Sequence, residues 1–169
     1  ELVERAIEGD HEAFCVLVRA SLTRLYAVAS LILRDGDRAQ DVVQDALILA
    51  WRDVRALRDP EAWEAWLHRL TVRCCYQATR RERRRNLVEL HVEPDPETAG
   101  AVDMTITHAE RDRMQRELGR LAFDQRAVMV LHFYLDLPLT EAADILGIPV
   151  GTAKSRLHRG LEALRTSLR

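Results

Sequence analysis

The chain has 169 residues and a net charge of −2, and 47% of its residues are hydrophobic. This length leaves room for one ordinary domain or two small ones. No apolar run approaches the ~20 residues that a membrane span needs, and no secretory signal opens the sequence, so we expect no membrane insertion. The three cysteines are odd in number and lack metal-ligand spacing, which favours a reduced cytoplasmic protein without metal or cofactor.

The charge is distributed unevenly along the chain. Residues 50–85 contain 10 basic and 5 acidic residues, and residues 150–169 contain 5 basic residues and 1 acidic residue. Between them, residues 86–110 contain 6 acidic residues and no basic one. Two basic zones predict contact with a polyanion at two places.

Helical periodicity dominates the sequence, and no segment predicts a strand. Asp10 is expected to cap a long first helix, which the stretch RDGD ends with Gly36 as its C-terminal residue. A second helix follows, and its apolar face consists of Ala39, Val42, Val43, Ala46, Leu47, Ala50 and Val54. Its outer face carries a stripe formed by Asp41, Gln44, Asp45 and Ile48. An acidic stripe with an exposed isoleucine suits a protein partner better than DNA, although a solvated face would explain the acids alone.

The stretch LRDPEAW begins a third helix, because it predicts a cap at Asp59 and a proline at the first helical position, Pro60. The face of this helix that contains Trp63 is expected to be buried, and the helix ends in the basic run RRERRR. The opposite face is expected to carry Arg69, Val72, Tyr76, Arg80 and Arg83. Arginines beside an exposed aromatic ring suit nucleic acid, because cations hold phosphates and a ring can stack on a base. Packing of Tyr76 under the linker is the alternative.

The segment 86–110 contains two prolines and one glycine besides its six acids. It predicts an acidic flexible linker between two small helical domains, residues 1–85 and 111–169. The predicted fold class is therefore all-α.

The second domain ends in two helices joined by a turn that contains Gly147 and Pro149. One face of the last helix has small and apolar residues and is expected to pack against the preceding helices. It consists of Ala153, Leu157, Gly160 and Leu164. The other faces are polar and basic, with Thr152, Lys154, Ser155, Arg156, His158 and Arg159. Two helices joined by a short glycine-containing turn, the second with a basic outer face, form the helix-turn-helix pattern and predict DNA binding.

Four stretches of the sequence, in order, resemble the extracytoplasmic-function (ECF) group of bacterial RNA polymerase sigma factors. The stretch AQDVVQDALILAWRDV is similar to that family's region two, and WLHRLTVRCCYQATRRERRR to the conserved helix that follows it. LGRLAFDQRAVMVLHFY is similar to the family's Leu-Pro-x-x-x-Arg helix, with Ala122 in place of the proline, and LGIPVGTAKSRLHRG closely resembles region four.

The resemblance implies a factor that binds core RNA polymerase and directs it to promoter DNA, without enzymatic activity or cofactor. The stripe from Asp41 to Ile48 would contact a coiled coil of the polymerase. The last helix would read the upstream (minus-thirty-five) element. The downstream (minus-ten) element would be contacted by Arg55, Arg58, Asp59, Arg69, Tyr76, Arg80 and Arg83. An anti-sigma factor would clamp between the domains or cover the polymerase-binding stripe.

Two other classes of protein compete with this interpretation. A stand-alone helix-turn-helix regulator would need a dimer interface, and the sequence shows no coiled-coil heptads or effector domain. An enzyme would need a nucleophile beside a base, a glycine-rich phosphate loop or a metal-ligand spacing, and none of these patterns is present.

Overall fold

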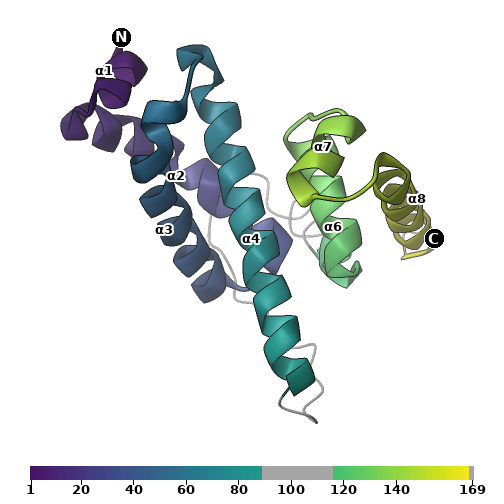
Figure 1. The fold of residues 1–169 in the computed structure, drawn as a ribbon. Coiled ribbons are helices and arrows are strands. Elements are labelled where there is room, and N and C mark those ends of the chain that lie inside the picture. Colours follow the sequence, from purple (N-terminus) through teal and green to yellow (C-terminus); the bar gives the residue numbers. More distant parts are fainter. Residues whose placement is uncertain (89–115, 168–169) are drawn as a thin grey trace. The chain divides into compact units, whose positions relative to one another are not determined.

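The computed structural model describes residues 1–88 and 116–167, and within these ranges the regular structure is helical, with no β-strand. Two compact units make up the chain (Figure 1). Of the described residues, 1–30 and 37–88 belong to the first unit, and 31–36 and 116–167 belong to the second. The all-α fold class predicted from helical periodicity is confirmed. Most of the predicted linker, 86–110, lies outside the described residues, but helix α4 continues to Val88, past the expected boundary.

The first unit contains α1 (Leu2–Glu8), α2 (His11–Leu33), α3 (Gly36–Asp53) and α4 (Trp63–Val88). Two short 3-10 helices, η1 (Val54–Ala56) and η2 (Pro60–Ala62), lie between α3 and α4. Helix α1 was not anticipated from the sequence. Figure 1 shows α1 and the segment between α3 and α4 at the same end of this unit, and α1 packs against η1.

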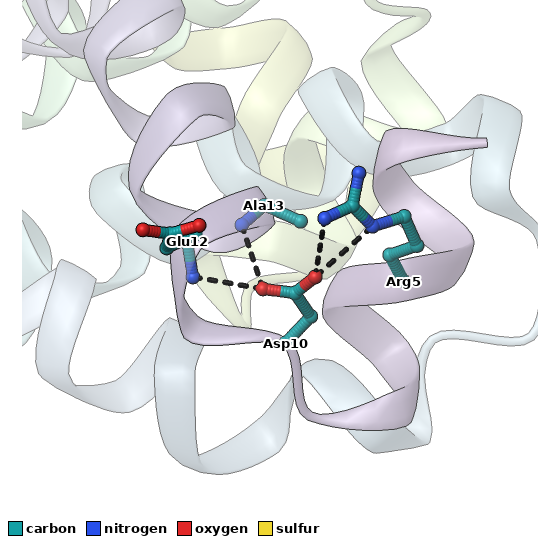
Figure 2. Close-up of polar contacts among 4 residues, drawn as sticks. All are labelled: Arg5, Asp10, Glu12 and Ala13. Carbon is teal, nitrogen blue, oxygen red and sulfur yellow. Dashed lines mark hydrogen bonds and ion pairs between the residues drawn. The ribbon is translucent and has the colours of Figure 1, made fainter.

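The predicted caps of the first unit are present. Oδ1 of Asp10 accepts hydrogen bonds from the backbone N–H groups of Glu12 and Ala13 at 2.9 and 3.1 Å, which caps α2 (Figure 2). Asp59 accepts a bond from the N–H of Glu61 at 3.0 Å, with Pro60 at the start of the helix. Both caps satisfy backbone donors that would otherwise lack a partner at a helix start.

The predicted break of the first long helix at RDGD is confirmed, but the role predicted for Gly36 is wrong. Helix α2 ends at Leu33, and the residue with left-handed backbone is Arg34, at φ 60°. Gly36 instead begins α3, with Asp37 in the first turn. Negative charge is favourable at a helix N-terminus, which explains why the acidic stretch after Arg34 starts a helix and does not end one.

Aromatic contacts and ion pairs join the helices of the first unit. The ring of Phe14 on α2 contacts Trp51 on α3 and Trp63 on α4, with centroids 5.0 and 5.8 Å apart. Arg24 on α2 pairs with Glu64 on α4 at 3.5 Å, and on the same helix Glu82 pairs with Arg38 of α3 at 2.7 Å. The fully buried core includes Leu25, Val28, Ala46, Leu67 and Cys75.

Helix α2 is long and apolar enough to cross a membrane by length and composition, which corrects the expectation that no segment reaches this threshold. About a third of that stretch is buried inside the protein, including Leu25, Val28 and Ala29. Core helices of globular proteins meet the same test, so the feature is weak support for a membrane span.

The second unit contains a helical segment at 116–120, α6 (Phe123–Met129), a π-helix η3 (Val130–Tyr134), α7 (Leu139–Leu146) and α8 (Val150–Ser167). Helix α8 packs against both α6 and α7. Its approach to α6 is close, because a Cβ on Gly160 would lie 2.8 Å from Sδ of Met129. Ala122 precedes α6 at φ −56°, an angle that proline also adopts, so this departure from the resembled family leaves the helix start unchanged.

Candidate nucleic-acid and polymerase interfaces

The turn between α7 and α8 has the geometry of a helix-turn-helix. Gly147 adopts the left-handed conformation at φ 64°, and its N–H bonds to the carbonyl of Asp144 at 3.2 Å. The carbonyl of Pro149 then accepts the N–H groups of Thr152 and Ala153 at 2.9 and 3.1 Å, which starts α8. Glycine suits this turn because its left-handed backbone angles strain residues that carry a Cβ.

Helix α8 separates an apolar face from a polar one, as its sequence predicts. Ala153 and Gly160 are buried, and Leu157 and Leu164 are half-buried. Of the predicted upstream-element residues, four are exposed and two are half-buried; the exposed ones are Lys154, Ser155, His158 and Arg159, and the half-buried ones are Thr152 and Arg156. All six residues therefore lie on one helix, in its N-terminal half.

Three of these side chains have partners within the protein. Arg156 lies 3.8 Å from the carboxylate of Asp124 on α6 and is only 21% exposed. Ser155 donates its hydroxyl hydrogen to the carbonyl of Gly151 at 3.0 Å, so the oxygen is left as an acceptor for a base or a water. His158 lies 3.3 Å from Glu162, one turn further along α8.

The predicted downstream-element residues lie on two segments. Arg55 on η1 and Arg58 and Asp59 in the following loop are exposed. The carboxylate of Asp59 has a structural role, because it accepts the capping hydrogen bond from the N–H of Glu61. On α4, Arg69 and Tyr76 are half-buried, whereas the two predicted cations nearer the helix end, Arg80 and Arg83, are exposed.

The prediction that Val72 shares the outer face of α4 is wrong, because Val72 is fully buried. The buried surface of α4 is wider than the tryptophan side alone, since Thr71, Cys75 and Thr79 are buried too. A helix covered by other helices on two sides buries more than one stripe. The exposed part of α4 is consequently narrow before Arg80, whereas every residue from Arg80 to Arg85 is exposed.

The predicted polymerase-binding stripe lies on the outer face of α3. Asp41, Gln44, Asp45 and Ile48 are all exposed, and the side chain of Ile48 is 60% exposed. The apolar face predicted for this helix is buried at Ala39, Val42, Val43, Ala46, Ala50 and Val54, with Leu47 half-buried. The acids and the isoleucine therefore form a surface that contributes nothing to the core.

Among the described residues, sequence reasoning missed three exposed aromatic positions, Trp51, Phe133 and Tyr134. Trp51 is 38% exposed and lies one turn beyond Ile48, where its ring packs edge-on to His11 at 5.1 Å. Spacing of three residues from Ile48 was the available signal. Phe133 on η3 is 58% exposed, and its ring is tilted by 59° against that of His132, with the ring centroids 4.8 Å apart. No periodic pattern of the sequence distinguishes it from a core residue.

The cysteines offer no reactive thiolate on the surface of α4. Cys74 and Cys75 are buried and free, and Cys15 is half-buried. Burial raises the pKa of Cys75 to about 12, and it also raises the pKa of Cys74. Within residues 1–88 and 116–167, no group of three or more His, Cys, Asp or Glu side chains could hold a metal ion.

Both units match models of known protein families. Residues 17–85 match the model of sigma-70 region 2, and residues 111–164 match the model of sigma-70 region 4. The chain is 32% identical to the ECF RNA polymerase sigma factor SigM of Mycobacterium tuberculosis, over 94% of this chain and 79% of the relative. The chain belongs to the ECF group of RNA polymerase sigma factors. A sigma factor directs transcription initiation, and the stand-alone regulator is not favoured.

Other relatives of this ECF sigma factor span nearly its whole length. The ECF RNA polymerase sigma-E factor of Escherichia coli K12 is 30% identical, over 96% of this chain and 90% of the relative. Among solved structures, the sigma factor RpoE in complex with the anti-sigma factor NepR from Bartonella quintana is 27% identical, with a TM-score of 0.65 over 92% of this chain and 96% of that chain. CnrH in complex with the cytosolic domain of CnrY is 26% identical, with a TM-score of 0.63 over 99% and 94%.

Proposed function

We propose that this ECF sigma factor binds core RNA polymerase through α3, reads the upstream promoter element with α8, and contacts the downstream element with η1, the loop after it and α4. The observation that carries this assignment is the exposed polar and basic face at the start of α8, presented by a helix whose other face is buried. Phosphate contacts would position the factor, and contacts to base edges would select the sequence. It works in the cytoplasm with the polymerase and catalyses no reaction itself.

Run-off transcription tests this function. Core RNA polymerase is mixed with a pool of promoter-containing DNA fragments, with and without the chain. Discrete transcripts are expected only when the chain is present. Equal transcription with and without it would contradict the proposal.

The polymerase-binding stripe gives a sharper prediction. Replacing Asp45 with Arg and Ile48 with Ser together should weaken binding to core polymerase, because both side chains are exposed on the outer face of α3. Thermal unfolding should change little, since surface substitutions away from buried features usually shift stability by less than about 0.5 kcal/mol. Titration of core enzyme by native gel measures the affinity, and unchanged affinity would show that the surface is wrong.

We also propose that an anti-sigma factor regulates this chain. The support is that two similar sigma factors were solved in complex with CnrY and NepR. Such a partner would compete with core polymerase for the stripe on α3. A protein recovered with the chain from its host should therefore be displaced by core polymerase, and should fail to bind the double variant at Asp45 and Ile48.

A further inference from the structure

A network around the carboxylate of Asp10 holds the turn between α1 and α2. Oδ2 accepts hydrogen bonds from Nε and Nη2 of Arg5 at 3.0 and 2.6 Å, while Oδ1 caps α2 (Figure 2). The bond from the backbone N–H of Ala13, and then the bond from Arg5, hold the pKa of Asp10 below its ordinary value. Asp10 is thus charged at neutral pH and ties the last turn of α1 to the first turn of α2.

Gly9 lies inside this turn. The guanidinium of Arg55 lies beside its Cα, at the place that a side chain would occupy. The backbone of Gly9 is left-handed at φ 104°, and its N–H bonds to the carbonyl of Ala6 at 3.1 Å. A Cβ at this position would come within 2.8 Å of Nη2 of Arg55. Helix α1 packs against η1, the short helix that carries Arg55. The turn therefore forms the surface on which the guanidinium lies.

We propose that Gly9 is a positioning residue for Arg55 in promoter recognition, assisted by the pair of Arg5 and Asp10 that shapes the turn. The proposal rests on the proposed function, in which Arg55 contacts the downstream element. A planar guanidinium lying against the glycine has the direction of its N–H donors fixed. A methyl group on Gly9 would push the guanidinium away, and because this is the far end of a flexible side chain, the core need not move.

The test uses the full chain bound to core polymerase and a forked DNA that contains the downstream element and lacks the upstream one. Gly9→Ala and Arg55→Ala should each weaken fork binding by about tenfold, the loss typical of one contact to nucleic acid. The double variant should bind no more weakly than Arg55→Ala alone, because Gly9 acts through Arg55. Affinity for core polymerase should be unchanged in all three.

Two further variants separate positioning from folding. Gly147→Ala introduces a side chain at another left-handed glycine, φ 64°, but with nothing within 4 Å of the new Cβ, so it should leave fork binding unchanged. Arg5→Gln removes the ion pair without altering Gly9 or Arg55. Arg5→Gln should weaken fork binding less than Gly9→Ala does. This loss should occur only when Arg55 is present. The variant keeps the proposal testable if Gly9→Ala does not fold.

The outcomes distinguish this proposal from the function on which it rests. A loss from Gly9→Ala or Arg5→Gln that is equally large in the Arg55→Ala background would show a merely structural role and overturn the positioning role. Normal fork binding by Arg55→Ala, in a holoenzyme that transcribes, would also overturn it and would leave the sigma function standing. Failure of the unmodified chain to support transcription would refute the proposed function itself.

Discussion

Two cations on α8, Arg159 and Lys154, differ in what they are expected to contact. Arg159→Ala should cost about 1–3 kcal/mol on a cognate upstream element and relax sequence choice, because a guanidinium can form paired bonds to one base. Lys154→Ala should weaken binding to all sequences similarly, since an ammonium mainly holds phosphate. Holoenzyme affinities for cognate and scrambled elements measure both. Equal losses on the two DNAs for Arg159→Ala would contradict the assignment.

Arg156 needs a different expectation from the one its sequence suggests. Its position on the basic face of α8 predicts a phosphate contact, but its guanidinium lies 3.8 Å from the carboxylate of Asp124 and its side chain is only 21% exposed. A cation engaged in this way contributes less to a surface field than an exposed one, because part of its charge is compensated by the neighbouring carboxylate.

His68 gives a prediction about pH. Its side chain is buried, its Nδ1 lies 2.6 Å from the carbonyl of Glu64, and burial lowers its pKa, assisted by Arg24. The folded state therefore disfavours the protonated ring, whereas the unfolded chain binds a proton below about pH 6.5. Stability should fall as the pH drops through that value.

The variant His68→Gln should lose this dependence, because glutamine does not titrate. Unfolding can be followed by tryptophan fluorescence, since all three tryptophans belong to the first unit. His158→Gln removes an exposed histidine of the second unit and serves as the control. The same loss of stability toward pH 5 with and without His68 would rule out this origin.

Among the elements, the crossing of α8 over α6 depends on one small residue. Gly160→Leu should destabilise the second unit by about 1–3 kcal/mol, because a side chain there overlaps Met129, which is itself buried. Leucine favours helix more than glycine does, so helix propensity cannot explain a loss. Thermal melting followed by circular dichroism measures it.

Gly151→Leu provides the matched comparison on the same helix. No atom lies within 4 Å of a Cβ at Gly151, so this substitution should be neutral or stabilising. Similar destabilisation by both variants would show that the close approach of α8 and α6 is unimportant.

Across the whole molecule, the candidate DNA contacts are divided between two units, α8 in one and the segment from Arg55 to Arg83 in the other. Two modules without a fixed spacing gain little effective concentration from being linked. We therefore expect weak promoter binding by the protein alone and strong binding with core polymerase. Footprinting with and without core enzyme measures this. Tight, sequence-specific protection by the protein alone would revive the stand-alone regulator.

The long helices of the first unit, the caps at Asp10 and Asp59 and the two faces of α8 could be predicted from the sequence, because these features depend on residues close together in the chain. Periodicity and capping act within a few turns, so they can be read directly from the order of residues. Membership of the sigma family could also be predicted, because its four motifs can be read directly from the order of residues. The assignment of individual contact residues stays a prediction.

Which apparently outward residues are covered depends on how the helices pack against one another. Val72 is buried because α4 is covered on more than one side, and Arg156 faces Asp124 across a helix crossing. The contact of Arg55 with Gly9 joins residues 46 positions apart in the chain, which no local pattern of residues predicts. Contacts of this kind arise from the packing of separate elements, and a local pattern carries no information about which elements will meet.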